Sequence, residues 1–213
     1  YLFHAFLRTL ATNVFADDLG FAKQSVNGLS AVKAMLYMLD PATPAGDKGF
    51  CNDVNATTGA SVATHTCTEQ VGIALVQAYK TLIATVGAPS TWVWGRVHTM
   101  QPVSLLALVT TDYQPGPYAR PGGAFTVDVG NPSLSGAGTS FAFSSSGNVR
   151  HVSVMDPAKP IVRMQLPGPE RDAPTHVVGP DLLGQWAANK YFDFAFGSQI
   201  DGVALSTQPF KAP

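Results

Sequence analysis

Ser30 and Lys33 are the first residues whose types and spacing could do chemistry. They have the Ser-x-x-Lys form of serine acylases that use a lysine base, and their spacing suits a helix. The Ser-Asp-Asn and Lys-Thr-Gly elements that accompany the motif in such enzymes are absent from the sequence. We therefore interpret the Ser30–Lys33 spacing as a chance match.

A second candidate is His98, which follows Trp94 and Arg96 at two-residue spacing. The histidine could be a general base or a substrate contact, or it could be held by hydrogen bonds beside stacked indoles. A general base needs a nucleophile within reach, and none is implied nearby, so we favour the structural role. Trp92 and Trp94 could line an acyl pocket, but such a pair more often belongs to a sheet core.

The remaining polar residues form no catalytic constellation. Arg150 and His151 are adjacent on an expected strand and must point to opposite faces. Residues 170–172 are interpreted as a solvated turn in a proline-rich loop. The sequence has no Gly-x-Ser-x-Gly elbow, no His-Glu-x-x-His and no phosphate loop. It therefore assigns no catalytic residue, no metal-binding residue and no cofactor, and the five histidines show no ligand spacing: His4, His65, His98, His151 and His176.

Cys51 and Cys67 flank a segment rich in Asn, Asp, Thr, Gly and Ala, which is typical of a loop. Two free buried thiols are one interpretation. We prefer a disulfide, because loop cysteines at this density seldom have a packing role. Such a bond would contribute on the order of 3 kcal/mol by the chain-entropy estimate. It would also place the protein in the periplasm or outside the cell.

The composition limits the classes of partner. Charged residues make up 13% of the 213 residues and apolar residues 46%. A chain this poor in charge either builds a large core or covers another chain. The net charge of −1 gives no electrostatic reason to expect nucleic acid or an anionic membrane as a partner. No apolar run is long enough for a membrane-spanning helix.

Hydrophobic spacing predicts helices in the first part of the chain and strands in the rest. Helices are expected at residues 2–19, from Asn27 or Ser30 to Pro41, at 68–86 with Thr66 or Thr68 as cap, and at 182–189 with Asp181 as cap. Strands are expected at residues 92–98, 124–129, 139–144, 149–155 and 161–166, with 103–109 as a strand or packed loop. This order is typical of an α+β fold.

Several segments together resemble a known family. They are Trp92-Val93-Trp94-Gly95-Arg96-Val97-His98, residues 120–128, residues 147–156, Leu166-Pro167-Gly168 and the aromatic segment 186–196, with the cysteine pair ahead of a helix. Their order resembles the C-terminal half of the β subunit of penicillin acylases, which are N-terminal-nucleophile amidohydrolases. The chain departs from the family at residues 166–172, where a Gly-Gly-Gln-Ser-Gly-like loop is usual.

The resemblance implies a four-layer αββα sandwich, to which this chain would supply antiparallel strands and outer helices. It also implies an exported precursor that cuts itself. A Ser, Thr or Cys at the new N-terminus of another chain would be the nucleophile, with its own α-amino group as base. Backbone N–H groups and an Asn side chain would hold the oxyanion. None of these positions matches a residue of this sequence.

We therefore expect residues 1–213 to be a single piece of a larger domain, mainly helical over 1–90 and mainly strands and loops over 91–213. It would be the non-nucleophile chain of a periplasmic or extracellular amidase acting on β-lactams, acyl-homoserine lactones or acyl peptides. The start at Tyr1 favours a fragment released by proteolysis over a chain trimmed for expression. The alternatives are a secreted ligand-binding module without catalysis and an inactive acylase homologue.

Overall fold

The structure is a computed structural model. It describes residues 1–22, 28–40, 49–102, 108–109, 116–134, 138–143, 145–147, 149–167 and 182–194. The chain divides into two compact units, Tyr1–Ser146 and Gly147–Pro213. Across the described residues, no helix is both long enough and apolar enough to cross a lipid bilayer.

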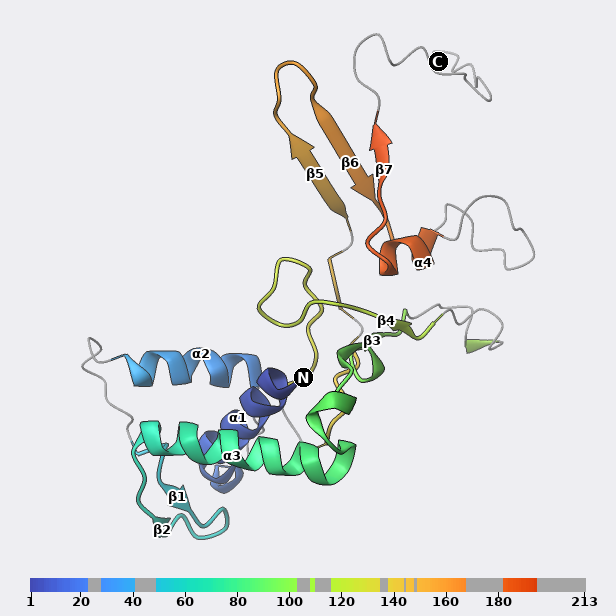
Figure 1. The fold of residues 1–213 in the computed structure, drawn as a ribbon. Coiled ribbons are helices and arrows are strands. Elements are labelled where there is room, and N and C mark those ends of the chain that lie inside the picture. Colours follow the sequence, from blue (N-terminus) through green and yellow to red (C-terminus); the bar gives the residue numbers. More distant parts are fainter. Residues whose placement is uncertain are drawn as a thin grey trace. The chain divides into compact units, whose positions relative to one another are not determined.

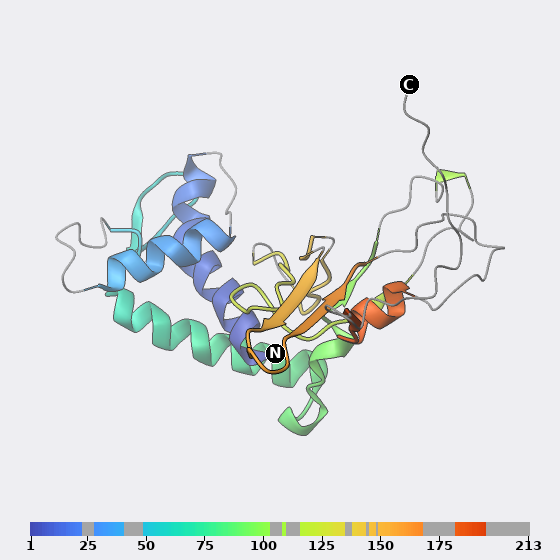
Figure 2. The ribbon, with the colours of Figure 1, turned by 90° about the horizontal axis from the view of Figure 1, so that it is seen from above.

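Three helices form the body of the first unit: α1 (Leu2–Phe21), α2 (Gly28–Leu39) and α3 (Cys67–Val86). Their bounds confirm the helices that hydrophobic spacing predicts. Helix α1 lies between α2 and α3 (Figure 1; Figure 2). The core between them is made of residues at three- and four-residue spacing, which share one helix face: Leu10, Ala11 and Val14 of α1, Ala31 and Met35 of α2, and Ala74 of α3.

Helix α3 has the start and the stop that its sequence predicts. The Thr66 hydroxyl accepts a hydrogen bond from the backbone N–H of Glu69, and the Glu69 carboxylate accepts one from the N–H of Thr66. This capping box satisfies two N–H groups that would otherwise lack a partner in the helix. The helix ends at Gly87, whose φ of 100° excludes most other residues, and Pro89 follows.

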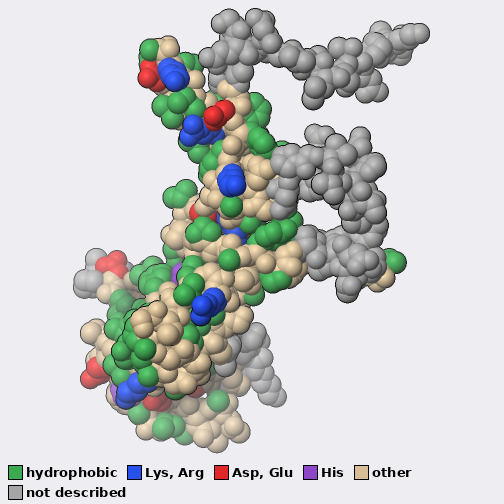
Figure 3. All heavy atoms as spheres, turned by 45° about the vertical axis from the view of Figure 1, so that its right-hand side comes forward, with side chains coloured by type: hydrophobic (Ala, Val, Ile, Leu, Met, Phe, Trp, Pro, Cys, Tyr) green, Lys and Arg blue, Asp and Glu red, His purple; other side chains and the backbone are tan. Residues whose placement is uncertain are grey.

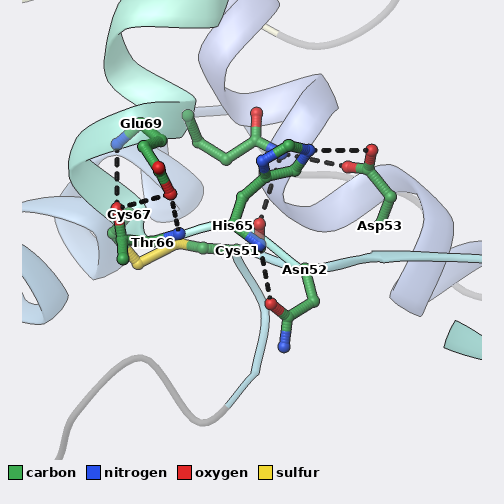
Figure 4. The surroundings of a disulfide bond; sticks show 8 residues. Cys51, Asn52, Asp53, His65, Thr66, Cys67 and Glu69 are labelled. Atoms are coloured by element: carbon green, nitrogen blue, oxygen red, sulfur yellow. Dashed lines mark hydrogen bonds and ion pairs between the residues drawn. A yellow bond between two sulfur atoms is a disulfide. The ribbon is translucent and has the colours of Figure 1, made fainter. Parts of the chain in front are cut away.

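The disulfide joins Cys51 to Cys67 and so attaches the loop before α3 to the first turn of that helix (Figure 4). The Cα atoms are 5.1 Å apart, and Cys51 is fully buried against α1. Within the loop, strands β1 (Asp53–Val54) and β2 (Ser61–Ala63) form a short antiparallel hairpin. Gln70 Nε2 donates to the Cys51 carbonyl and to Asp53, which holds this hairpin on α3.

Residues 92–98 were expected to form a strand, and this prediction is wrong. The segment contains one 3-10 turn, η2 (Trp94–Arg96), and directly follows another, η1 (Pro89–Thr91). The backbone N–H of His98 donates to the carbonyl of Trp94 at 2.9 Å, as in a helical turn. Trp94 and His98 therefore share a face at four-residue spacing rather than at the two-residue spacing of a strand.

Where the structure describes the first unit after η2, the strands are short. Strand β3 (Thr99–Met100) pairs antiparallel with β4 (Tyr118–Ala119). The strand expected at 124–129 is wrong: this segment is a turn flanked by an isolated bridge between Gly123 and Val129. A strand is also expected at 139–144. Its described residues form a single isolated bridge, between Phe143 and Met100. Most of 103–109 lies outside the described residues.

The described residues of the second unit form a three-stranded antiparallel sheet and one short helix. Strand β6 (Ile161–Gln165) lies between β5 (Arg150–Val154) and β7 (Phe192–Phe194). The two longer strands confirm the sequence prediction, and α4 (Leu182–Ala187) is the expected last helix. Its predicted cap, Asp181, lies outside the described residues. Together the units confirm a mixed α+β fold.

Candidate functional site

The strongest polar and aromatic cluster of the first unit surrounds Trp94. The indole is stacked between the imidazoles of His4 and His98, with ring centroids 4.6 and 4.5 Å away. His98 in turn stacks on Phe143 at 4.4 Å. Phe141 contacts both His4 and Trp94. We call these residues, His4, Trp94, His98, Phe141 and Phe143, the ring cluster.

His98 is fully buried at the centre of the ring cluster. Its Nδ1 lies 2.8 Å from the carbonyl oxygen of Arg120, and its Nε2 lies 3.2 Å from that of Gly130. Both ring nitrogens therefore face acceptors in the backbone. A base that must take a proton from a substrate needs a free nitrogen directed at that substrate. This geometry supports the structural role that the sequence favours for His98.

His4 is the second buried imidazole of the cluster, and it is held in its neutral form. Its Nε2 accepts a hydrogen bond from the backbone N–H of Ala124 at 3.2 Å, so that nitrogen carries no proton. Burial, and to a lesser degree nearby positive charge, lowers the pKa of His4 to about 4. His4 therefore attaches helix α1 to the segment around residue 124.

That segment, residues 120–130, is fixed from several sides. The Arg120 guanidinium, almost fully buried, pairs with the Asp128 carboxylate at 2.6 Å. The Trp94 indole donates to the carbonyl of Gly122 at 2.8 Å. Gly122 has a φ of 78°, and a Cβ on Gly130 would approach His98 and Phe143 to within 3.0 Å. Glycine is needed at both positions, so the segment works as a rigid support for the ring cluster.

Arg8 of α1 closes the other side of the cluster. Its guanidinium lies 4.0 Å from the centre of the Phe141 ring, at cation–π distance. The same group donates to the carbonyl oxygens of Ser133, Gly138 and Ser140. These bonds use both Nη atoms of Arg8 within the protein. Arg8 therefore fixes the 133–140 segment on α1.

A cleft of about 420 Å³ lies beside Arg8, between α1 and α3. Its walls carry hydroxyl and amide groups together with small apolar side chains: Ala5, Arg8, Thr9, Thr12, Asn13, Ala78, Thr81, Leu82, Gly138 and Thr139. Asn13 Nδ2 donates to Gln77 across the two helices. Among the described residues of this lining, Arg8 is the one titratable side chain, and these residues supply no general base at neutral pH.

The other residues that the sequence singles out do not belong to the ring cluster. Ser30 and Lys33 are exposed on α2. In the second unit, the Arg150 guanidinium stacks on Trp186 at 4.6 Å and donates to its carbonyl, while His151 is exposed. The two side chains therefore point in different directions, as predicted. Residues 170–172 lie outside the described residues.

The described part of the second unit contains one hydroxyl–imidazole contact. Ser153 Oγ lies 3.3 Å from His151 Nε2, and both side chains are exposed on β5. A serine nucleophile also needs a group that orients the base and donors that hold the oxyanion. An open strand surface offers neither, so we assign this pair no catalytic role. Among the described residues, no group of three or more His, Cys, Asp and Glu could hold a metal ion.

Sequence reasoning missed the roles of His4, Arg8 and the Arg120–Asp128 pair. Arg120 and Asp128 stand in a segment whose Pro-Gly-Gly start signals an ordered loop, and the buried charge pair is the reason for that order. His4 and Arg8 are one turn apart on α1, where a buried polar pair interrupts the apolar face. This interruption is the sequence signal for the two residues, although it does not show which residues they contact.

Comparisons with known proteins bear on the function of the chain. No curated protein matches the chain significantly. The sequence profile of the penicillin amidase family, in contrast, matches residues 1–200, which is nearly the whole chain. The match includes the segments around Trp94 and residues 120–130 that build the ring cluster. The chain therefore belongs to the penicillin amidase family, a family of acylase-type hydrolases.

Proposed function

We propose that this chain is the non-nucleophile chain of a processed amidohydrolase that cleaves N-acyl amide bonds. In this account a partner chain of the same precursor carries the N-terminal Ser, Thr or Cys. Its α-amino group, with a pKa close to neutral, takes the proton of the nucleophile as the acyl–enzyme bond forms. The present chain supports that site and supplies part of its wall. Family membership and the side-chain geometry of the ring cluster support the proposal.

The observation that carries the proposal is the apolar surface left exposed by this chain. Helix α3 buries one face against α1 and exposes a second set of large apolar side chains: Leu75, Val76, Tyr79 and Ile83, each at least 39% exposed. In the second unit, Phe192 and Phe194 of β7 and Val152 and Val154 of β5 are exposed as well. Figure 3 shows hydrophobic side chains on the visible surface with few charged ones between them.

The exposed residues of α3 share one side of that helix. Phe192 and Phe194 share one face of the sheet, and the two valines of β5 lie on its opposite face. Contiguous apolar faces are unusual on a monomer in water. A second polypeptide would remove them from solvent. Burial of each large side chain would contribute about 1.5–3 kcal/mol. Among the strands that the structure describes, β5 and β7 each have a neighbour on one side, so a partner strand could also extend the sheet.

The proposed substrates are small N-acylated compounds of the β-lactam, acyl-homoserine lactone or acyl-peptide type. The proposed location is the periplasm or the outside of the cell. The Cys51–Cys67 bond supports this location, because disulfides persist in oxidising compartments. The fold proposed for the assembled enzyme is the four-layer αββα sandwich, with strands of this chain in its sheets.

The proposal is tested by expressing the whole precursor with an affinity tag on this chain. The purified assembly is assayed for release of p-nitroaniline from N-acyl p-nitroanilides of increasing acyl length. We expect hydrolysis by the assembly and none by the isolated chain. Hydrolysis by the isolated chain would contradict the proposal that the partner chain carries the nucleophile. A partner chain that co-purifies without any activity would instead favour an inactive homologue.

A further inference from the structure

We propose that the second apolar face of α3 binds one amphipathic helix of the partner chain, running antiparallel to α3. We call this face, made of Gly72, Leu75, Val76, Tyr79 and Ile83, the outer face of α3. The inference rests on the proposed function, because it assigns an occupant from the partner chain. It goes further by stating which surface is covered and by what kind of segment.

The spacing of the outer face favours a helix as its occupant. Gly72, Val76, Tyr79 and Ile83 follow one another at intervals of three and four residues, which forms a stripe along the helix axis. The buried residues of α3, which include Ala74, Ala78 and Leu82, form a different stripe. Tyr79 touches Trp92 edge-on, with ring centroids 5.7 Å apart, and yet remains largely exposed with the rest of the outer face. The apolar surface of α3 is thus wider than the face that packs against α1, as expected for a helix placed between two neighbours.

Gly72 makes a close approach possible near the start of the outer face. A Cβ placed on Gly72 would meet no atom of the described residues within 4 Å. A shallow groove begins there and is lined by His65, Glu69, Gly72, Ile73, Val76 and Gln77. In a helix, Gly is unfavourable by roughly 1 kcal/mol relative to Ala. The exposed Gly72 of α3 therefore has a cost that no contact with the described residues offsets.

Charge fixes the direction of the occupant. Glu69 and Lys80 are eleven residues apart, about three turns, and so lie on the same border of the outer face. Hydrogen bonds from Thr66 lower the pKa of the Glu69 carboxyl, which keeps it negatively charged. Asp53 adds a second carboxylate at this end, beside His65. The outer face is therefore acidic at the start of α3 and basic three turns later.

An antiparallel helix matches this pattern best. Its first turn would lie near Lys80 and its last turn near Glu69. Acidic residues are favourable in the first turn of any helix and basic residues in the last, because of the helix dipole. The charges that the partner helix favours at its own first and last turns are thus opposite to the charges at the two ends of the outer face. A parallel helix would place like charges together at both ends.

Photo-crosslinking in the assembly made from the whole precursor tests the inference. p-Benzoylphenylalanine is placed at Val76 or at Ile83, with Asn55 in the exposed β1–β2 turn as the control position. Mass spectrometry of the crosslinked peptides should place both contacts in one stretch of the partner. The residue crosslinked from position 83 should precede the residue crosslinked from position 76. The reverse order, crosslinks to a second copy of this chain, or no crosslinks in an intact active assembly would overturn the inference.

Charge variants give a second readout. Lys80→Glu should weaken retention of the partner about fivefold, the size of an exposed ion-pair effect, whereas Lys80→Arg and the control Lys190→Glu should leave it unchanged. Equal retention in Lys80→Glu would contradict the antiparallel charge match. If no partner co-purifies with the unmodified chain, the proposed function itself fails. If the assembly forms and hydrolyses amides but the crosslinks are absent, this inference fails while the proposed function stands.

Discussion

The imidazole of His4 occupies the space that a Cβ atom on Gly123 would need. His4 comes from the first turn of α1, and Gly123 lies about 120 residues later in the segment that supports the ring cluster. Beside this contact, the backbone N–H of Ala124 donates a hydrogen bond to His4 Nε2. Glycine at position 123 thus lets the backbone approach the ring stack, and the two residues form one structural unit.

Gly123→Ala should therefore lower the free energy of unfolding by about 1–3 kcal/mol, because the new methyl group must displace a ring fixed by Trp94. The loss should shrink in the double variant His4→Ala/Gly123→Ala, since the alanine at position 4 leaves room. Gly72→Ala is the matched control and should be neutral or stabilising in the isolated chain. Urea unfolding measures all of them. Additive losses in the double variant would show that the two residues are independent.

The low pKa of His4 predicts that acid weakens the first unit. The pKa is about 4 in the folded state, against 6.5 for an unperturbed histidine. Between these values the unfolded state binds more protons, so the free energy of unfolding falls as the pH falls. The contribution is complete above about pH 6.5, and at most about 3 kcal/mol is lost by pH 4.

The measurement is urea unfolding at several pH values between 7 and 4, compared with the variant His4→Gln. Glutamine can accept the hydrogen bond from Ala124 but does not titrate. The pH dependence over this range should be smaller in His4→Gln than in the unmodified protein. If the free energy of unfolding depends equally on pH in both proteins, groups other than His4 cause the acid sensitivity.

The Arg120–Asp128 pair should contribute far more to the free energy of unfolding than the Arg163–Asp193 pair. The side chain of Arg120 is 1% exposed and that of Asp128 25%, whereas Arg163 and Asp193 are 50% and 71% exposed. Asp128→Asn leaves a buried guanidinium without its carboxylate and should cost about 2–3 kcal/mol. Asp193→Asn should cost less than about 1 kcal/mol. Similar losses in thermal unfolding would contradict the role assigned to the buried pair.

Reduction of the disulfide should destabilise the first unit by about 3 kcal/mol, because the bond closes a loop of 16 residues. Cys51 is fully buried, so reduction should require partial unfolding. Cys51→Ala/Cys67→Ala gives the same test without a reductant. Alkylation followed by mass measurement reports the bond directly. Rapid labelling of both thiols in the native, non-reduced protein would show that the bond is absent.

The three long helices could be predicted because their apolar residues repeat over many turns. For α3 the Thr66 cap and the Gly87 stop add independent local signals. The β5–β6 hairpin was predictable for a similar reason: turn residues bound two runs of strand-forming residues, Val149–Met155 and Ile161–Leu166.

The ring cluster could not be predicted in the same way. Seven residues from Trp92 to His98 fit both an alternating strand and a helical turn, and only the hydrogen bond from His98 to Trp94 decides between them. Residues 124–129 have strand-forming side chains, but the close packing at Gly122 and Gly123 imposes a turn. His4, Trp94, His98 and the 120–130 segment meet through tertiary contacts, which no local pattern contains.

The most direct test of the central claim is native mass spectrometry of the tagged assembly, combined with N-terminal sequencing of each chain in it. We expect the 22.4 kDa chain to be held together with at least one further chain of the same precursor. That chain should begin with Ser, Thr or Cys. A stable 22.4 kDa species that travels alone, with its apolar faces protected from solvent, would contradict the account.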